Sequence, residues 1–174
     1  MTLNCEWIPP IITLSDFDGD WYRYDEHIYS IFVRDFIENP MIFNGKPLRI
    51  RRPPMPCDKA QAYFHVTNKD SSLSTSDPND RIPDFRRCER IEWIRLFLEH
   101  YDCNRGCSGC NGIKVWKEPY KGNRRWHFLF EEFKFLVIIE ERLEYFLLIS
   151  GFYIFNNTVM NKKLRRYNRF KDKA

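Results

Sequence analysis

The spacing of apolar residues changes along the chain, from a helical period in its N-terminal part to a strand period in its C-terminal part. Between Asp20 and Asn39 apolar residues recur every three or four positions, which predicts an amphipathic helix. Asp20 is a typical N-cap residue, and Pro40 ends the helix because proline cannot continue its hydrogen bonds. The predicted apolar stripe consists of Tyr24, Ile28, Ile31, Phe32 and Phe36.

The middle of the chain is expected to contain a strand, a long loop and a second helix. Residues 62–67 are predicted as a strand, and the polar segment 70–84 as an exposed loop. Residues 41–57, which several prolines interrupt, are expected to be short strand or loop. The second helix is predicted at 86–100, with Asp84 near its start. Its apolar face consists of Ile91, Ile94 and Leu98.

The C-terminal half has apolar runs separated by short polar breaks, which is typical of strands. The breaks at 121–123 and 140–142 favour tight turns, so we expect an antiparallel meander. The predicted fold class is α+β, with N-terminal helices, a C-terminal antiparallel β-sheet and a closing basic C-terminal helix. The predicted strands are residues 113–116, 126–130, 133–139 and 145–155.

The length of the chain predicts a single domain, residues 1–174. We divide it into a helical lead-in (1–60), an α+β core (61–160) and a basic tail (161–174). Apolar residues make up 43% of the chain, which is enough for a core and argues against wholesale disorder. No apolar run is long enough to span a bilayer, and no basic leader precedes an apolar stretch. We therefore expect a cytoplasmic protein without a membrane partner.

A cysteine-rich segment is the candidate metal site. Cysteines in the cytoplasm are reduced, so a cluster of them indicates a metal before it indicates disulfides. His100, Cys103, Cys107 and Cys110 have the spacing H-x2-C-x3-C-x2-C, and such ligands suit one tetrahedral, structural zinc ion. Cys88 is an alternative to His100, and free thiols in a loop are the alternative to zinc.

The last fourteen residues contain seven Lys or Arg and one acid, Asp172, a net charge of +6. The whole chain has a net charge of +4, so the other residues sum to −2 and the basicity is local. Tyr167 and Phe170 lie among the cations, a pattern that favours single-stranded nucleic acid over the alternative of a solvated basic helix. The candidate nucleic-acid contacts are Lys162, Lys163, Arg165, Arg166 and Arg169.

His65 is the first candidate for acid–base chemistry, although a lone histidine in a strand is more often structural. Arg86, Arg87 and Arg90 open the second predicted helix, where cations oppose the helix dipole. A bound phosphate would remove that conflict, because a helix N-terminus favours an anion. The alternative is that these arginines pair with neighbouring carboxylates, including that of Glu89.

Six phrases spread over most of the chain carry a family resemblance. They are WIPPIITLSDFDGDWYRY (7–24), IYSIFVRDFI (28–37), FNGKPLRIRRPP (43–54), DRIPDFRRCERIEWIR (80–95), IKVWKEPYKGNRRWHFLFEE (113–132) and YFLLISGFYI (145–154). Together they resemble a family of prophage-encoded proteins with a proposed BECR fold, the barnase–EndoU–colicin–RelE nuclease group. The resemblance implies a small, toxin-like endoribonuclease that uses the 2′-hydroxyl of its RNA substrate as nucleophile and needs no catalytic metal.

The resemblance also implies roles for particular residues. It makes His65 the general base or acid, Arg87 and Arg90 phosphate clamps, and Glu89 a partner of an arginine or of His65. Ser150 and Tyr153, near the end of the last predicted strand, would orient the substrate or stabilise an oxyanion. The expected partners are RNA and an antitoxin or immunity protein.

The chain departs from the family pattern shortly before its basic tail. Residues 156–159 contain no histidine where the family tends to have one. The alternative function is therefore a non-catalytic prophage accessory protein that binds nucleic acid or a partner protein. A third is a zinc-stabilised interaction domain.

Overall fold

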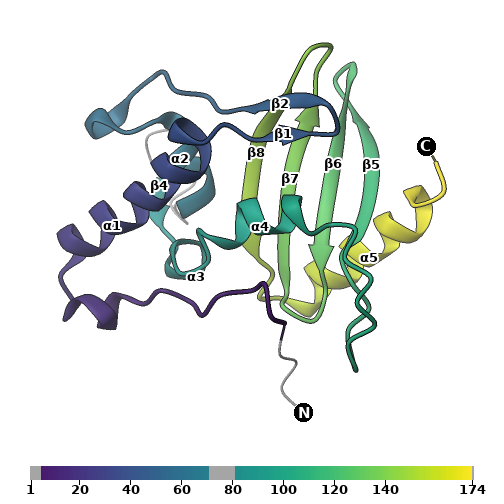
Figure 1. Ribbon diagram of the computed structural model, residues 1–174, viewed down its shortest axis with the longest axis horizontal. Helices are drawn as coiled ribbons and strands as arrows, with labels where there is room; N and C mark the ends of the chain where they lie inside the picture. Colours follow the sequence, from purple (N-terminus) through teal and green to yellow (C-terminus); the bar gives the residue numbers. More distant parts are fainter. Residues whose placement is uncertain (1–4, 71–80, 174) are drawn as a thin grey trace.

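The computed structural model describes residues 5–70 and 81–173 of the chain. Within these residues, a curled and mostly antiparallel sheet of six strands lies between helices on its two faces (Figure 1). This arrangement confirms the predicted α+β fold class. No helix in the described ranges has the length and apolarity to cross a membrane. The helical elements are η1 (Leu14–Phe17), α1 (Trp21–Val33), η2 (Arg34–Glu38), η3 (Pro56–Asp58), α2 (Gln61–Thr67), α3 (Phe85–Cys88), α4 (Trp93–Glu99) and α5 (Asn157–Phe170).

The first helix forms where the sequence predicts it. Asp20 caps α1, because its side chain accepts a hydrogen bond from the Arg23 backbone N–H at 3.2 Å. The helix continues into a π-helical turn, η2, and ends at Asn39. The predicted apolar stripe is buried, since each of its five side chains is 5% exposed or less.

The strand predicted at residues 62–67 is wrong, because this segment belongs to the helix α2. Successive buried positions are one or three residues apart, which marks a helix face, whereas a strand would bury alternate residues. A short apolar run does not distinguish these two states, and packing against the sheet favours the helix here. His65 therefore lies on a helix. The buried residues of α2 are Ala62, Tyr63, Val66 and Thr67.

The meander predicted for the C-terminal half is confirmed, and two short strands from the N-terminal part extend it. The strands of this sheet are β1 (Ile42–Phe43), β2 (Lys46–Arg49), β5 (Lys114–Tyr120), β6 (Asn123–Phe130), β7 (Phe135–Glu141) and β8 (Phe146–Tyr153). Within the described residues their order is β1-β2-β8-β7-β6-β5. β2 runs parallel to β8, and the other neighbours are antiparallel.

The loop predicted at residues 70–84 is wrong at both ends. β3 (Asn68–Asp70) and β4 (Arg81–Pro83) pair as a small antiparallel sheet. Residues 71–80, the rest of the predicted loop, lie outside the described residues. The pairing of β3 with β4 matters for the site, because it brings the start of β4 next to the end of α2.

The helix predicted at residues 86–100 is divided into α3 and α4 by a turn at 89–92. Asp84 caps α3, since its side chain accepts a hydrogen bond from the Arg86 backbone N–H at 3.0 Å. The predicted apolar face is buried despite the break, with each residue 1% exposed or less. That face consists of Ile91, Ile94 and Leu98.

The two faces of the sheet carry separate cores. In Figure 1, α4 lies in front of the sheet and α5 lies behind it. Aromatic side chains fill the face toward α4, where the rings of Phe97 and Phe135 meet edge to face with centroids 5.4 Å apart. On the opposite face, Met160 of α5 packs with Leu129 and Leu136 of the sheet. The sheet therefore separates a large helix-side core from a smaller core under α5.

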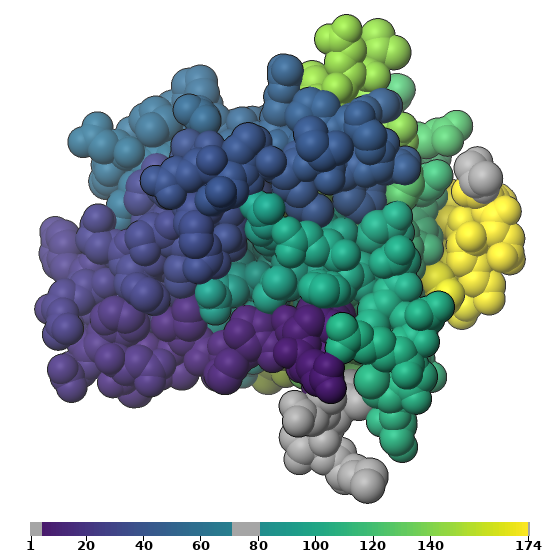
Figure 2. Space-filling model, viewed as in Figure 1, coloured from purple at the N-terminus to yellow at the C-terminus, as the bar shows by residue number. Residues whose placement is uncertain are grey.

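The N-terminal segment is held against α4 and the residues around it. Trp93 Nε1 donates a hydrogen bond to the Pro9 carbonyl oxygen at 3.1 Å, and the Ile12 N–H donates to the Glu89 carbonyl oxygen at 3.0 Å. Figure 2 shows this segment, in purple, lying along the teal surface of α4 and the loop after it. The start of the described chain thus forms part of the helix layer.

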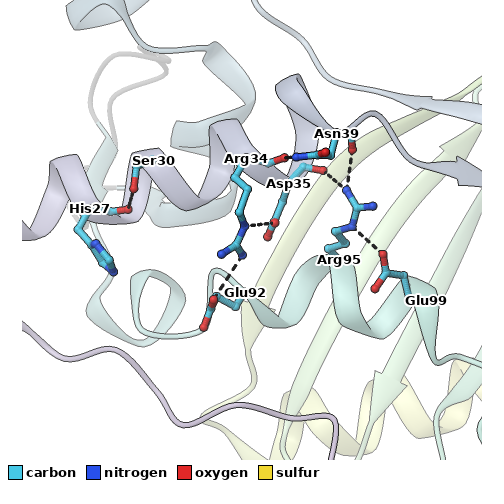
Figure 3. A network of polar contacts seen from close by, with 8 residues as sticks. All are labelled: His27, Ser30, Arg34, Asp35, Asn39, Glu92, Arg95 and Glu99. Atoms are coloured by element: carbon cyan, nitrogen blue, oxygen red, sulfur yellow. Dashed lines mark hydrogen bonds and ion pairs between the residues drawn. The ribbon is translucent and has the colours of Figure 1, made fainter.

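A polar network joins the end of α1 to α4 (Figure 3). Arg34 contacts the Asp35 carboxylate at 2.7 Å and the Glu92 carboxylate at 3.3 Å. Arg95 donates to the carbonyl oxygens of Asp35 and Asn39, both at 2.6 Å. Carbonyl groups at a helix end lack hydrogen-bond partners within the helix. Arg95 donates hydrogen bonds to two of them and so joins η2 to α4.

Candidate functional site

His65 lies on α2 beside arginines from four other places in the chain. Arg81 Nη1 is 2.5 Å from His65 Nδ1, and Arg87 Nη1 donates to the His65 carbonyl oxygen at 3.2 Å. Arg51 and Arg125 line one hollow together with His65. We call these five residues the His65 cluster.

The charge state of His65 follows from this environment. Burial lowers the pKa of His65 below its ordinary value, and the positive charges of Arg81 and Arg51 lower it further. Arg87 adds to this effect and Asp70 opposes it. The imidazole is therefore neutral at pH 7. A guanidinium group only donates, so Nδ1 accepts from Arg81 and the ring proton is on Nε2.

Two hollows are both lined by His65. The larger, of about 470 Å³, lies beside α2 and the β3–β4 pair and is lined also by Asp70 and Arg81. The smaller, of about 130 Å³, lies beside β8 and is lined also by Arg51 and Arg125. The imidazole thus borders two spaces whose walls carry guanidinium groups.

Carboxylates neutralise the His65 cluster only in part. Arg51 is exposed and forms no ion pair with a described residue. The cluster therefore keeps positive charge next to a neutral imidazole. The ion pairs of the other three arginines are Asp70 with Arg81 (3.4 Å), Asp84 with Arg87 (3.8 Å) and Glu140 with Arg125 (2.8 Å).

The structure brings together His65 and Arg87 from the predicted catalytic set, and it groups three others elsewhere. Glu89 pairs with Arg90 at 3.0 Å, and the Arg90 guanidinium lies 4.5 Å from the centre of the Tyr153 ring. Tyr153 packs against the helix-side core. These three residues form a separate group around the turn after α3.

Ser150, the last predicted catalytic residue, lies at an irregularity of β8. It pairs with Ile138 of β7, and the next pair joins Leu148 to Ile139, so Ile149 is the extra residue of a β-bulge. Among the described residues, no hydrogen bond joins the Ser150 side chain to the His65 cluster. Ser150 thus follows Ile149, which lines the smaller hollow beside His65, but Ser150 itself is not among the lining residues of that hollow.

Cations and aromatic rings alternate where α3 meets the end of β8. The Arg87 guanidinium lies 5.3 Å from the centre of the Phe152 ring, and the Arg86 guanidinium 4.0 Å from that of Phe155. The Phe155 side chain is 72% exposed, so its ring is accessible to a further planar group. Exposed rings among arginines are typical of surfaces on which nucleobases stack.

The predicted basic helix is confirmed as α5, and it is docked on the sheet. Its inner cations contact the protein: Arg166 forms an ion pair with Glu118, and burial lowers the pKa of Lys163. The outer cations lie at positions i, i+3 and i+7, which places them on one face of the helix. These exposed residues are Lys162, Arg165 and Arg169.

A buried histidine lies under α5. His127 is 5% exposed, and its ring stacks on Trp116 with centroids 4.8 Å apart. Burial lowers the pKa of His127 to about 4. Burial also opposes ionisation of Glu118, but hydrogen bonds from Arg166 and Trp116 outweigh it and bring the pKa of Glu118 to about 2. His127 is thus a neutral imidazole beside the Glu118 carboxylate, and Glu118 anchors α5 through its ion pair with Arg166.

Three of the predicted zinc ligands line one hollow, and His100 is not among the residues that line it. The His100 ring instead stacks on Trp7, with centroids 4.8 Å apart and planes 16° from parallel. Cys88, the alternative ligand, is 1% exposed and contacts the Thr67 carbonyl oxygen at 3.6 Å. Among the described residues, no three His, Cys, Asp or Glu side chains stand close enough to hold a metal ion. The cysteines of the hollow are Cys5, Cys103, Cys107 and Cys110.

Sequence reasoning did not identify Arg51, Arg81 and Arg125 as site residues. Arg51 and Arg125 each stand next to a second arginine, and such pairs were the available signal. Arg81 stands between Asp80 and Ile82, near the end of the polar segment predicted as a loop, without any pattern of its own. Because α2 is a helix, His65 lies about one turn from Ala62, and both residues line the same hollow as Arg51.

Comparisons with known proteins identify no relative of this chain. The family resemblance seen in the sequence therefore stays a prediction. The chain matches no protein-family model, no curated protein and no solved structure.

Proposed function

We propose that this protein binds single-stranded RNA at the His65 cluster and cleaves it without a metal ion, with the 2′-hydroxyl of the substrate as nucleophile. The observation that supports this most is the contact of the His65 ring with the Arg81 guanidinium group, at a residue that lines two hollows. Guanidinium groups bind phosphate strongly, often through two parallel hydrogen bonds. A neutral imidazole is the side chain best suited to accept a proton near pH 7.

The contact between Arg81 and His65 Nδ1 suggests the order of events. In the free protein Arg81 occupies Nδ1. A phosphodiester offers Arg81 a charged acceptor in its place, which releases Nδ1. Nδ1 then takes the proton of the 2′-hydroxyl while its oxygen attacks phosphorus. The P–O5′ bond breaks, a 2′,3′-cyclic phosphate forms, and the leaving 5′-oxygen takes a proton from solvent.

The arginines of the cluster would stabilise the charge that develops on the phosphoryl oxygens. Arg87 is held close to His65 by its hydrogen bond to the carbonyl oxygen, so its guanidinium is already oriented. Arg51 is exposed and forms no ion pair with a described residue, so a phosphate can recruit it at little cost. Preoriented donors of this kind contribute most when they are partly removed from water.

The aromatic residues at the end of β8 would receive the bases. Phe152 contacts Arg87 and the exposed Phe155 contacts Arg86, so both rings lie beside arginines that are neighbours in the chain. Bases stack on such rings only when they are not paired within a duplex, which is why we propose a single-stranded substrate. Stacking is tolerant of base identity, so we expect weak sequence preference.

The experiment is cleavage of single-stranded RNA by the full chain in the presence of a chelator. We expect products that end in 2′,3′-cyclic phosphate, and no cleavage of RNA that is 2′-deoxy at the scissile nucleotide. Arg81→Gln should slow the reaction on the order of tenfold or more, since it removes one charge-assisted contact to phosphate. Arg165→Gln removes the same charge from the exposed face of α5 and serves as the control.

Two results would contradict this proposal. One is cleavage that requires added magnesium and ignores the 2′-deoxy substitution, because the nucleophile would then not be the 2′-hydroxyl. The other is an equal loss of rate in Arg81→Gln and Arg165→Gln, because the effect would then be one of general charge.

RNA binding without turnover is the second candidate function. Among the described residues that line the two hollows, Asp70 is the only carboxylate and His65 the only imidazole. Asp70 is paired with Arg81, so the site offers little to protonate the leaving oxygen. Protein that binds single-stranded RNA and cleaves none at any pH would support this function over the first.

A further inference from the structure

Four of the six cysteines line one hollow, although they come from two segments far apart in the sequence. The hollow has a volume of about 270 Å³ and lies between the N-terminal segment and the loop after α4. Cys57 is exposed and Cys88 is buried under α2, so neither belongs to this group. The four are Cys5, Cys103, Cys107 and Cys110.

Cys107 and Cys110 stand on a tight turn of the kind that suits a metal ion. The Cys110 N–H donates to the Cys107 carbonyl oxygen at 3.1 Å, and the Gly112 N–H donates to Cys110 Sγ at 3.4 Å. Gly109, between the two cysteines, has a φ of 75°, which glycine adopts without strain. Two cysteines with this spacing form one half of many structural zinc sites.

Cys5 is held next to this turn by contacts that do not involve its thiol. Glu6 forms an ion pair with Arg105 of the loop, and the Trp7 ring stacks on His100. These contacts fix the residues that follow Cys5 against the loop. They also occupy one face of the His100 ring, which does not line the hollow.

We propose that Cys5, Cys103, Cys107 and Cys110 bind one zinc ion, with Cys5 in the place expected for His100. On binding, each thiol releases its proton to solvent, and four zinc–sulfur bonds of about 2.3 Å form. The sulfur atoms have to draw together for this, because no three of the described ligand side chains are yet grouped closely enough. Gly106 and Gly109 make the loop adaptable, since each has a positive φ and open space on its Cβ side.

Such a zinc ion would be structural, because four thiolates complete its shell and leave no position for water. It would fasten the N-terminal segment to the loop after α4, and that segment also receives the Trp93 hydrogen bond through Pro9. The hollow shares no lining residue with the two hollows at His65. The zinc proposal can therefore be tested independently of the proposed RNA function.

The test is elemental analysis of the untagged full chain, purified under reducing conditions without added metal. We expect about one zinc ion per chain. Cys5→Ser and Cys107→Ser should each lose it. Cys57→Ser removes an exposed thiol outside the hollow and His100→Gln removes the stacked imidazole, and both should keep the zinc.

A second measurement covers variants that fail to fold. Wild-type protein stripped of metal and reduced should bind one equivalent of cobalt with the strong thiolate-to-metal absorption of a four-sulfur site. The same spectrum is expected for His100→Gln. A wild-type chain that contains no zinc and whose reduced form binds neither zinc nor cobalt would overturn the proposal. Zinc that persists in Cys5→Ser and disappears in His100→Gln would overturn it as well.

Discussion

The His65 cluster and α5 are both rich in cations, but they are built in different ways. α5 takes its charge from one continuous run of sequence, and three of its cations point outward from the helix. The His65 cluster gathers its arginines from four separate segments around one imidazole. The cations that are easiest to recognise in the sequence thus form an exposed face of α5. The His65 cluster, with its imidazole, forms only when the chain folds.

The two regions also differ in how far their charges are removed from water. The side chains of Arg81 and Arg87 are 18% and 16% exposed, whereas the outer cations of α5 are exposed, as is Arg51 of the cluster. Charges that are partly desolvated interact more strongly, and exposed ones are screened by salt. We therefore expect the His65 cluster to determine affinity and chemistry, and α5 to add a salt-dependent contribution.

Loss of the imidazole should have the largest effect on RNA cleavage. His65→Ala should reduce RNA cleavage roughly 10²-fold or more and leave binding nearly unchanged, because a general acid–base group contributes about 10² to 10⁴ in rate. His27→Ala, which removes an exposed histidine of α1, is the matched control. A rate that is the same in His65→Ala and in wild type would remove His65 from the mechanism.

A packing mutation tests whether α5 is a docked helix or a free basic arm. Met160 is 8% exposed in the core under α5, so Met160→Ala should lower the free energy of unfolding by roughly 2–5 kcal/mol. Val159, its neighbour, is 40% exposed, and Val159→Ala should change it by about 0.5 kcal/mol or less. Urea unfolding of both variants makes the measurement. Equally small changes in the free energy of unfolding of both variants would mean that α5 is not held on the sheet by the packing of Met160.

Two exposed arginines allow the regions to be compared directly. Arg51→Ala should weaken the binding of single-stranded RNA on the order of tenfold, since a charge-assisted hydrogen bond contributes about 1.5–3 kcal/mol. Arg165→Ala should weaken it only slightly at physiological salt and make the log–log salt slope shallower by about 0.7. Titrations at several salt concentrations measure both. A larger loss in Arg165→Ala would move the main contact to α5.

The stability of the folded protein should depend on pH through His127, which lies in the core under α5. The pKa of His127 is about 4 in the folded protein, below its ordinary value of about 6.5. The unfolded chain therefore binds a proton that the folded chain does not, and stability should fall as pH drops from about 6.5 toward 4. His65 acts in the same direction. His127→Gln should make unfolding less dependent on pH in this window, and an unchanged dependence would contradict the assignment.

The parts of the fold that sequence analysis predicted are those with long, unambiguous apolar spacing. The stripe from Tyr24 to Phe36 and the four strands of the meander each repeat their pattern over enough residues to decide the structure. α2 is too short for that, and its helical state depends on packing against β8. The parallel pairing of β2 with β8 joins strands far apart in sequence, for which no local signal exists.

The candidate site was predictable only where one residue type was unusual in its context. His65 and Arg87 were named for that reason, but their meeting depends on α2 being a helix and on β4 pairing with β3. Arg81 lies in β4, and nothing near it in the sequence points to His65. Cys5 likewise has no cysteine near it, so only the folded N-terminal segment relates it to the loop after α4.

The most direct test of the central claim is to observe the histidines while RNA binds. The chain has four histidines, so selective isotope labelling gives a simple NMR spectrum. Titration with a single-stranded RNA that is 2′-deoxy throughout its central nucleotides measures binding without cleavage. The account predicts saturable shifts of the His65 ring signals while those of His27 and His100 stay in place. Unchanged His65 signals, with shifts confined to backbone amides of α5, would contradict it.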